Sequence, residues 1–128
     1  METLTTKGIK ISVAVRYQSS QSRPAHNQFV FAYQITIENL GEHTVKLLRR
    51  HWHIYDTCGM RREIEGEGVI GKQPILRPGE LHQYTSWCPL FSGMGKMWGG
   101  YLMESQLDQS RFKVRIPEFQ MIAPSKLN

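Results

Sequence analysis

The chain has 128 residues, of which 40% are hydrophobic and 21% charged, as is usual for one globular domain with its own core. Its net charge of +5 comes from Lys and Arg residues that are scattered, with short clusters only at 49–50 and 61–62. Dispersed charge favours solubility over nucleic-acid binding. Because no segment reaches the roughly 20 apolar residues of a membrane span and no signal peptide precedes residue 10, we expect a cytoplasmic protein with two reduced cysteines, Cys58 and Cys88.

Short strands separated by turn residues follow one another along the chain. Apolar and polar residues alternate at 9–17 and, after a polar loop, at 29–38; turns at 39–42 and 56–59 then bound a strand at 44–55. Further strands are expected at 62–65, 80–86, 96–104 and 111–116. No helical period persists, so we predict an all-β, fibronectin-III- or immunoglobulin-like sandwich of about seven or eight antiparallel strands. Residues 1–6 and 123–128 are expected to be loose termini of this single domain, 1–128.

A glycine-rich segment follows the strand at 62–65 and matches the Gly-x-Gly-x-x-Gly pattern at Gly66, Gly68 and Gly71. In a dinucleotide-binding loop that pattern leads into a helix, which Pro74 and Pro78 exclude here. One interpretation is an anion site made by backbone amides, with charge from Lys72, Arg61 and Arg62. The other is a set of bulges and tight bends, which we favour because no Gly-Lys-Ser/Thr sequence follows.

Several motifs in this order resemble those of the ApaG family. They are Leu-Arg-Arg-His-Trp at 48–52, Glu-Gly-Glu-Gly-Val-Ile-Gly-Lys-Gln-Pro at 65–74, Leu-Arg-Pro-Gly-Glu at 76–80, Tyr-Thr-Ser at 84–86, Cys-Pro-Leu at 88–90, Met-Trp-Gly-Gly-Tyr at 97–101, and 112–119. The resemblance spans residues 7 to about 122. It implies a fibronectin-III-like sandwich without an established enzymatic activity, and its copies in larger proteins imply a protein-interaction module.

One candidate partner surface is the strand that carries Arg49, His51 and His53. Side chains two apart on a strand share a face, so these three project together. Arg and ring-bearing side chains suit a binding face. The two histidines also form a candidate pair of zinc or copper ligands, although such a site needs a third. His82, Asp56, Cys58 and Cys88 supply the right atoms, but the sequence fixes none of their distances, so no metal site is predicted.

A second candidate partner surface, the one we favour, is apolar and lies around the glycines at 93 and 95. Its exposed members are expected to be Trp87, Phe91 and Trp98, with Met94 and Met97 nearby. Aromatic and Met side chains anchor partners well, and sandwich loops commonly carry function. Half of these residues are expected to belong to the core instead.

No complete catalytic set stands out, so we expect a protein that is not an enzyme and has no cofactor. Cys88, followed by Pro89, is expected to be a buried hydrophobe rather than a nucleophile. Glu63, Glu65 and Glu67 alternate on one face, which predicts a solvated strand edge.

Two functional hypotheses of different class follow. The favoured one is a small interaction module whose partner is another protein. The alternative is a binder or sensor of an anionic nucleotide or pyrophosphate, held by the loop from Gly66 to Lys72. Neither a membrane nor a nucleic acid is expected as a partner.

Overall fold

The computed structural model describes residues 1–126, which contain nine strands and three single-turn 3-10 helices. The strands are β1 (Glu2–Thr6), β2 (Ile9–Tyr17), β3 (Phe29–Asn39), β4 (Val45–Asp56), β5 (Arg61–Glu67), β6 (Ile75–Leu76), β7 (Leu81–Leu90), β8 (Met94–Ser105) and β9 (Arg111–Ile122). The helices are η1 (Ser19–Gln21), η2 (Pro24–His26) and η3 (Pro124–Lys126). None of the helices in the described residues is long and apolar enough to cross a membrane.

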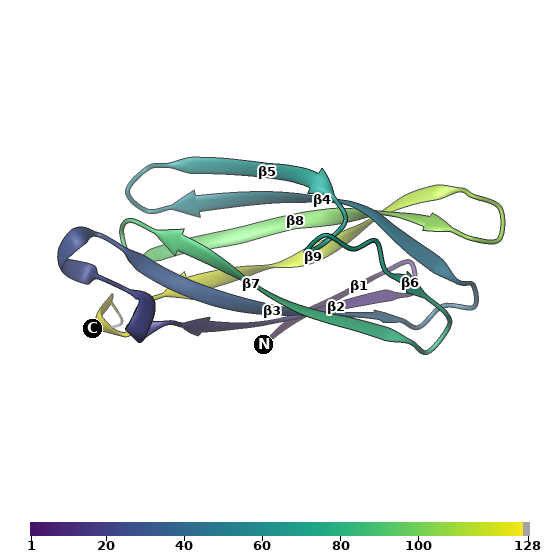
Figure 1. Ribbon diagram of the computed structural model, residues 1–128, viewed down its shortest axis with the longest axis horizontal. Coiled ribbons are helices and arrows are strands. Elements are labelled where there is room, and N and C mark those ends of the chain that lie inside the picture. The colour runs from purple at the N-terminus through teal and green to yellow at the C-terminus, as the bar shows by residue number, and fades with distance from the viewer. Residues whose placement is uncertain (127–128) are drawn as a thin grey trace.

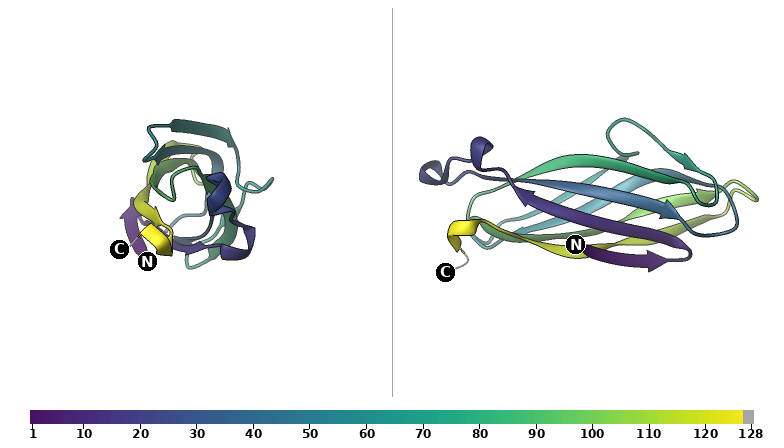
Figure 2. Two further views of the ribbon diagram at one scale, coloured as in Figure 1. Left: turned by 90° about the vertical axis from the view of Figure 1, so that its left-hand side faces the viewer. Right: turned by 90° about the horizontal axis from the view of Figure 1, so that it is seen from below.

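The strands form two antiparallel sheets that face each other (Figure 1). The first sheet has the order β1-β2-β3-β7, and the second has the order β5-β4-β8-β9, with β6 paired to the start of β4. Viewed end-on, β1 and β9 lie side by side on one flank (Figure 2). On the other flank Arg62 of β5 donates a hydrogen bond to the carbonyl oxygen of Pro89 in β7. The predicted all-β sandwich is confirmed, with nine strands in the described residues instead of seven or eight.

The core fills the space between the sheets because each strand turns alternate side chains inward. Its largest fully buried members, each below 2% exposed, include Phe31, Ile35, Ile37, Leu47, Met97, Tyr101 and Met103. Along β4 the alternation changes phase. Val45 and Leu47 point inward at the start of the strand, whereas Trp52 and Ile54 point inward further along.

A β-bulge causes this phase change, since the pairing of β4 with β8 shifts register between Leu47 and Arg49. The extra residue is Leu48. Without it, strict alternation from Leu47 would send the odd-numbered residues of β4 into the core. With it, Arg49, His51 and His53 face outward. The bulge therefore places the candidate partner face predicted from the sequence.

The expected loose N-terminus, 1–6, is wrong. Glu2–Thr6 forms β1 and pairs with β2 from Glu2 opposite Val13 to Thr6 opposite Ile9. Lys7 and Gly8 both have positive φ (50° and 82°), as a two-residue hairpin turn requires. Thr-rich sequence then suffices for an edge strand.

At the C-terminus part of the expected loose segment, 123–128, is also ordered. Ala123 is fully buried and its N–H donates to the carbonyl oxygen of Gly93, and η3 follows. Residues 127–128 lie outside the described part. Two strands also run past the prolines at which we expected them to end, Pro89 in β7 and Pro117 in β9. Both strands are sheet edges, where a missing N–H breaks no ladder.

Candidate functional site

The glycine segment is bonded within itself. Ile70 and Gly71 have positive φ (47° and 72°), and the chain closes around them as a two-residue turn. The N–H of Val69 donates to the Lys72 carbonyl at 2.8 Å, and the N–H of Lys72 donates back to Val69 at 3.0 Å. The N–H of Gly68 donates to Leu48 at 2.9 Å. Three amides that an anion site would need are therefore engaged, as the interpretation as tight bends predicts.

The basic residues assigned to that site do not gather around it. Arg61 and Arg62 begin β5, whereas Gly66 lies near its end and the other glycines beyond it, so roughly 13–20 Å of extended strand separates the arginines from the start of the glycine segment. The Arg61 guanidinium lies 5.4 Å from the Tyr55 ring centroid, and Arg62 donates to the Pro89 carbonyl oxygen at 2.5 Å. The structure thus does not bring together Gly66, Gly68, Gly71, Lys72, Arg61 and Arg62.

An arginine that the sequence did not single out supports the segment from inside. Arg50 donates from Nη1 to the carbonyl oxygens of Glu67 (3.1 Å) and Gly68 (3.0 Å). A Cβ at Gly66 would lie 2.8 Å from its guanidinium, so a side chain there would displace the end of Arg50. Arg50 therefore supports the backbone of this segment.

The expected apolar partner surface is divided between the two sheets. Trp87 is 51% exposed on the outer face of β7, in the first sheet, whereas Trp98 lies on the outer face of β8, in the second. The chain crosses between the sheets at residues 91–93, so neighbours in sequence end up on opposite sides. Phe91, 49% exposed, lies at this crossing, and Met97 is in the core. One continuous site made of Trp87, Phe91 and Trp98 is therefore wrong.

The outer face of the second sheet carries a groove of about 400 Å³, here called the outer-face groove. Its walls come from β4, β8 and β9, together with Glu65 of β5. Arg49 lies opposite Leu102, which lies opposite Lys113; His51 lies opposite Gly100, which lies opposite Arg115. Gly100 presents no side chain between His51 and Arg115. Arg49, His51, His53 and Trp98, four of the residues predicted to contact a partner, line this one surface.

The groove carries positive charge that nothing in residues 1–126 neutralises through an ion pair. Arg49, Lys113 and Arg115 are all exposed, and none lies within 4 Å of a carboxylate oxygen in the described chain. Each comes from a strand, so the fold fixes the backbone from which the cationic side chain projects. Such an arrangement is suited to a carboxylate or phosphate.

A row of stacked rings forms one wall of the groove. The His53 ring is stacked on Trp98 with centroids 5.3 Å apart and an 11° angle between planes, and the His51 ring lies 4.5 Å from that of His53. The Lys96 ammonium lies 5.5 Å from the Trp98 ring centroid. Stacking on Trp98 restricts the orientation of the His53 ring, whereas the ring of an isolated surface histidine rotates freely.

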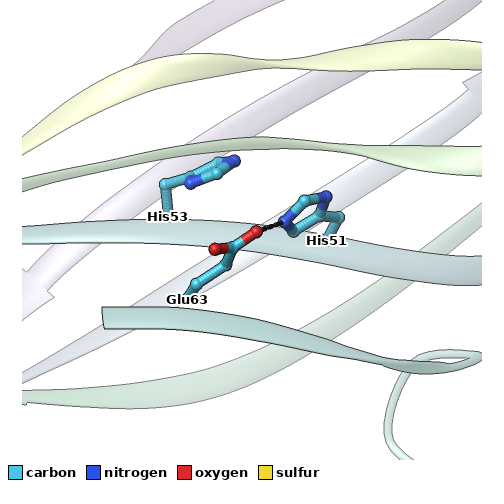
Figure 3. Close-up of side chains that lie close together, drawn as sticks. All are labelled: His51, His53 and Glu63. Atoms are coloured by element: carbon cyan, nitrogen blue, oxygen red, sulfur yellow. Dashed lines mark hydrogen bonds and ion pairs between the residues drawn. The ribbon is translucent and has the colours of Figure 1, made fainter. Parts of the chain in front are cut away.

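Two carboxylates from β5 flank His51. Its Nε2 lies 2.5 Å from Oε1 of Glu63 (Figure 3). Its Nδ1 lies 3.2 Å from Oε1 of Glu65. The prediction that the glutamates lie on a solvated edge is confirmed, because β5 ends the second sheet. Their proximity to the histidines was missed. The third potential metal ligand beside His51 and His53 is Glu63, and none of His82, Asp56, Cys58 and Cys88 belongs to this cluster.

The two cysteines are free. Cys58 is exposed, and Cys88 is 2% exposed. Burial raises the pKa of the Cys88 thiol, although the neighbouring Arg62 partly opposes that shift. A buried thiol that resists ionisation is a poor nucleophile, in keeping with the structural role expected for Cys88.

Comparison with known proteins identifies the family. A family model described as the ApaG domain matches residues 19–105. Protein ApaG of Paramagnetospirillum magneticum is 46% identical over 124 residues, 97% of this chain and 95% of its own length, and that of Brucella abortus is 40% identical over 126 residues, 98% and 96%. A crystal structure of an ApaA protein from Bordetella pertussis has a TM-score of 0.88 at 41% identity, covering 91% of this chain and 94% of that one. The resemblance seen in the sequence is confirmed: the chain belongs to the ApaG family.

Proposed function

We propose that this chain is a protein-interaction module without catalytic activity, and that it binds an acidic segment of a partner protein in the outer-face groove. The observation that carries the proposal is the set of three cations, Arg49, Lys113 and Arg115, that line the groove without an ion pair in the described residues.

The groups that line the groove suit an acidic peptide segment of a partner. Arg side chains bind carboxylates with two parallel hydrogen bonds, and Trp and Arg are the residues most enriched at the energetic centres of interfaces. Trp98 supplies an apolar wall beside the cations. The side-chain-free position at Gly100 lets a partner backbone approach the sheet closely.

The nucleotide hypothesis stays a prediction with less support than the interaction module. Its proposed site at Gly66–Lys72 has amides that are already bonded, and its arginines lie at the far end of β5. The nucleotide hypothesis is therefore tested beside the interaction module, in the titration described next.

The direct test is an amide chemical-shift titration of the full chain with a synthetic decapeptide rich in Asp and Glu around a central Tyr. Saturable shifts are expected on the outer faces of β4, β8 and β9, and they should weaken as salt is raised because exposed charges are screened. Arg115→Ala should weaken binding several-fold. Arg16→Ala, an exposed arginine on the outer face of the first sheet, is the matched control and should leave binding unchanged.

Two results would contradict the proposal. One is the absence of saturable shifts; the other is equal behaviour of Arg115→Ala and Arg16→Ala. A parallel titration with ATP and pyrophosphate tests the alternative, since shifts confined to residues 66–72 would favour nucleotide binding at the glycine segment. A partner protein captured from cell extract should likewise be lost with Arg115→Ala bait and kept with Arg16→Ala bait.

A further inference from the structure

We propose that His51, His53 and Glu63 form a binding site for a divalent transition-metal ion, Zn²⁺ in the first place. One ligand atom from each of the three residues lies within 4.8 Å of the other two. The inference depends on these side chains alone and not on the proposed peptide binding.

Strand pairing explains why the three ligands converge. His51 and His53 are two residues apart on β4 and share its outer face. β5 pairs with β4 so that Glu63 lies opposite His53 and Glu65 lies opposite His51. Glu63 therefore reaches His51 diagonally across the strand pair, as long side chains on one face of a sheet do.

The contact between His51 and Glu63 brings two potential metal ligands together. Nε2 of His51 lies 2.5 Å from Oε1 of Glu63, and a hydrogen bond links the two atoms (Figure 3). An imidazole nitrogen and a carboxylate oxygen both bind divalent transition metals, so a metal ion can take the place of the shared proton once the side chains move slightly apart.

The surroundings prepare the site for a metal. A ligand histidine commonly has a carboxylate beside its other ring nitrogen, and the Glu65 carboxylate lies 3.2 Å from Nδ1 of His51. The second histidine, His53, is oriented by its stack on Trp98. In tetrahedral zinc sites the ligand atoms lie about 3.3 Å apart, so exposed side chains need only small rotations to reach this geometry.

The ligand set selects the class of metal. Two imidazoles and one carboxylate suit zinc and its late first-row neighbours, whereas Mg²⁺ and Ca²⁺ prefer oxygen ligands throughout. Three protein ligands leave a fourth position open for water or for a donor from another molecule. Because His51 and His53 line the outer-face groove, that open position is at its wall.

The test is calorimetric titration of Zn²⁺ into the full chain and four variants. Wild type is expected to bind one Zn²⁺ with a dissociation constant in the micromolar range or tighter. His53→Ala and Glu63→Gln should each weaken binding at least about tenfold. His26→Ala, which removes an exposed histidine from η2, and Cys58→Ser, which removes the exposed thiol, are matched controls and should bind as wild type does.

The proposal is overturned if Zn²⁺ shows no saturable binding, or if His53→Ala and His26→Ala bind it equally. It is also overturned if Cys58→Ser alone abolishes binding, since the thiol would then be the ligand. Zn²⁺ should further shift the ring-proton NMR signals of His51 and His53 and leave those of His26 in place. Glu63 is exposed at the sheet edge, so Glu63→Gln provides a readout even if His53→Ala folds poorly.

Discussion

The glycine segment and the outer-face groove lie close together along β4 but use their polar groups in opposite ways. In the glycine segment the amides of Gly68, Val69 and Lys72 bond to main-chain carbonyls, and Arg50 bonds to two more carbonyls from inside. In the groove Arg49, one residue before Arg50, has no ion pair in residues 1–126. The glycine segment carries the better-known sequence motif, yet its polar groups are largely bonded within the fold.

The contrast teaches that a motif suggests function only when its polar groups remain available in the folded chain. Glycines that permit a positive φ or a close approach are needed for the backbone itself. Side chains that converge without an internal partner have no such structural purpose. Variants of the two regions should therefore separate stability from binding.

The largest effect on stability is expected for Gly68→Ala. Gly68 has φ of 66°, and an added Cβ would clash with the carbonyl oxygen of Lys72, which is backbone and cannot swing away. We expect a loss of about 3–4 kcal/mol in the free energy of unfolding, from left-handed strain plus the clash. Urea denaturation measures it.

Gly71→Ala is the matched control, because Gly71 has a similar φ of 72° but open space around a Cβ. It should lose only about 1 kcal/mol. Equal losses in the two variants would contradict the assignment of Gly68 as a site of close approach. Neither variant should change Zn²⁺ binding.

The next largest loss of stability is expected when a buried carboxylate, that of Asp56, is removed. Asp56 is 1% exposed and accepts hydrogen bonds from the amides of Phe91 (2.6 Å) and Ser92 (3.2 Å) and from the Ser92 hydroxyl, which hold the 91–93 crossing in place. Asp56→Ala should lose about 2–3 kcal/mol because these donors lose their acceptor. Glu63→Gln, on an exposed carboxylate, should change stability by less than about 0.5 kcal/mol.

The contribution of Asp56 should also depend on pH. Burial alone would raise the pKa of this carboxyl, but the hydrogen bonds from Phe91, Ser92 and Cys58 outweigh burial and lower the pKa below its ordinary value of 3.8. A lowered folded-state pKa means that the stabilisation is complete above the unfolded value and is lost as pH falls through the folded one. Stability should therefore drop less steeply in acid for Asp56→Ala than for wild type, as measured by urea titrations at pH values from neutral to below the folded pKa. Parallel acid profiles would contradict this role.

The adjacent residues Arg49 and Arg50 allow a comparison in which the expected change in stability is smaller. Arg50→Ala should lose about 1–2 kcal/mol of stability, since the carbonyls of Glu67 and Gly68 would lose a charged donor. Arg49→Ala should stay within about 0.5 kcal/mol of wild type but bind the acidic decapeptide more weakly. Thermal unfolding of the two variants measures their stability, and the peptide titration measures their affinity. A peptide defect in Arg50→Ala alone would reverse the assignment of the two residues.

Much of the fold was predictable because alternation is strong where one face is buried. The strand expected at 9–17 matches β2 residue for residue, and β3, β4 and β8 differ from expectation by one or two residues at either end. β1 was missed because its short run of Thr and Glu has no apolar stripe. Its partner strand and the Lys7-Gly8 turn determine its structure.

The site was only half predictable for a different reason. That His51 and His53 share a face follows from the period of a strand, but Trp87 and Trp98 were grouped by sequence distance, which a crossing between sheets defeats. Glu63 could not be found from the expected turn. A turn at 56–59 would pair Tyr55 with Met60 and place His53 opposite Arg62, whereas the structure pairs Tyr55 with Arg61 and His53 with Glu63 because its turn is one residue longer.

The two tryptophans offer the comparison with the smallest expected effect on stability. Both lie on outer faces, so Trp87→Ala and Trp98→Ala should each lose about 1 kcal/mol or less of stability by urea denaturation. Their effects on binding should differ. Trp98 stacks on His53 and lines the outer-face groove. Its loss frees the His53 ring and should weaken the binding of both Zn²⁺ and the acidic decapeptide. Trp87 stands on the other sheet and should leave both affinities unchanged. If Trp87→Ala were the variant that lost peptide binding, the interaction surface would belong to the first sheet, and the unpaired cations of the second would need another explanation.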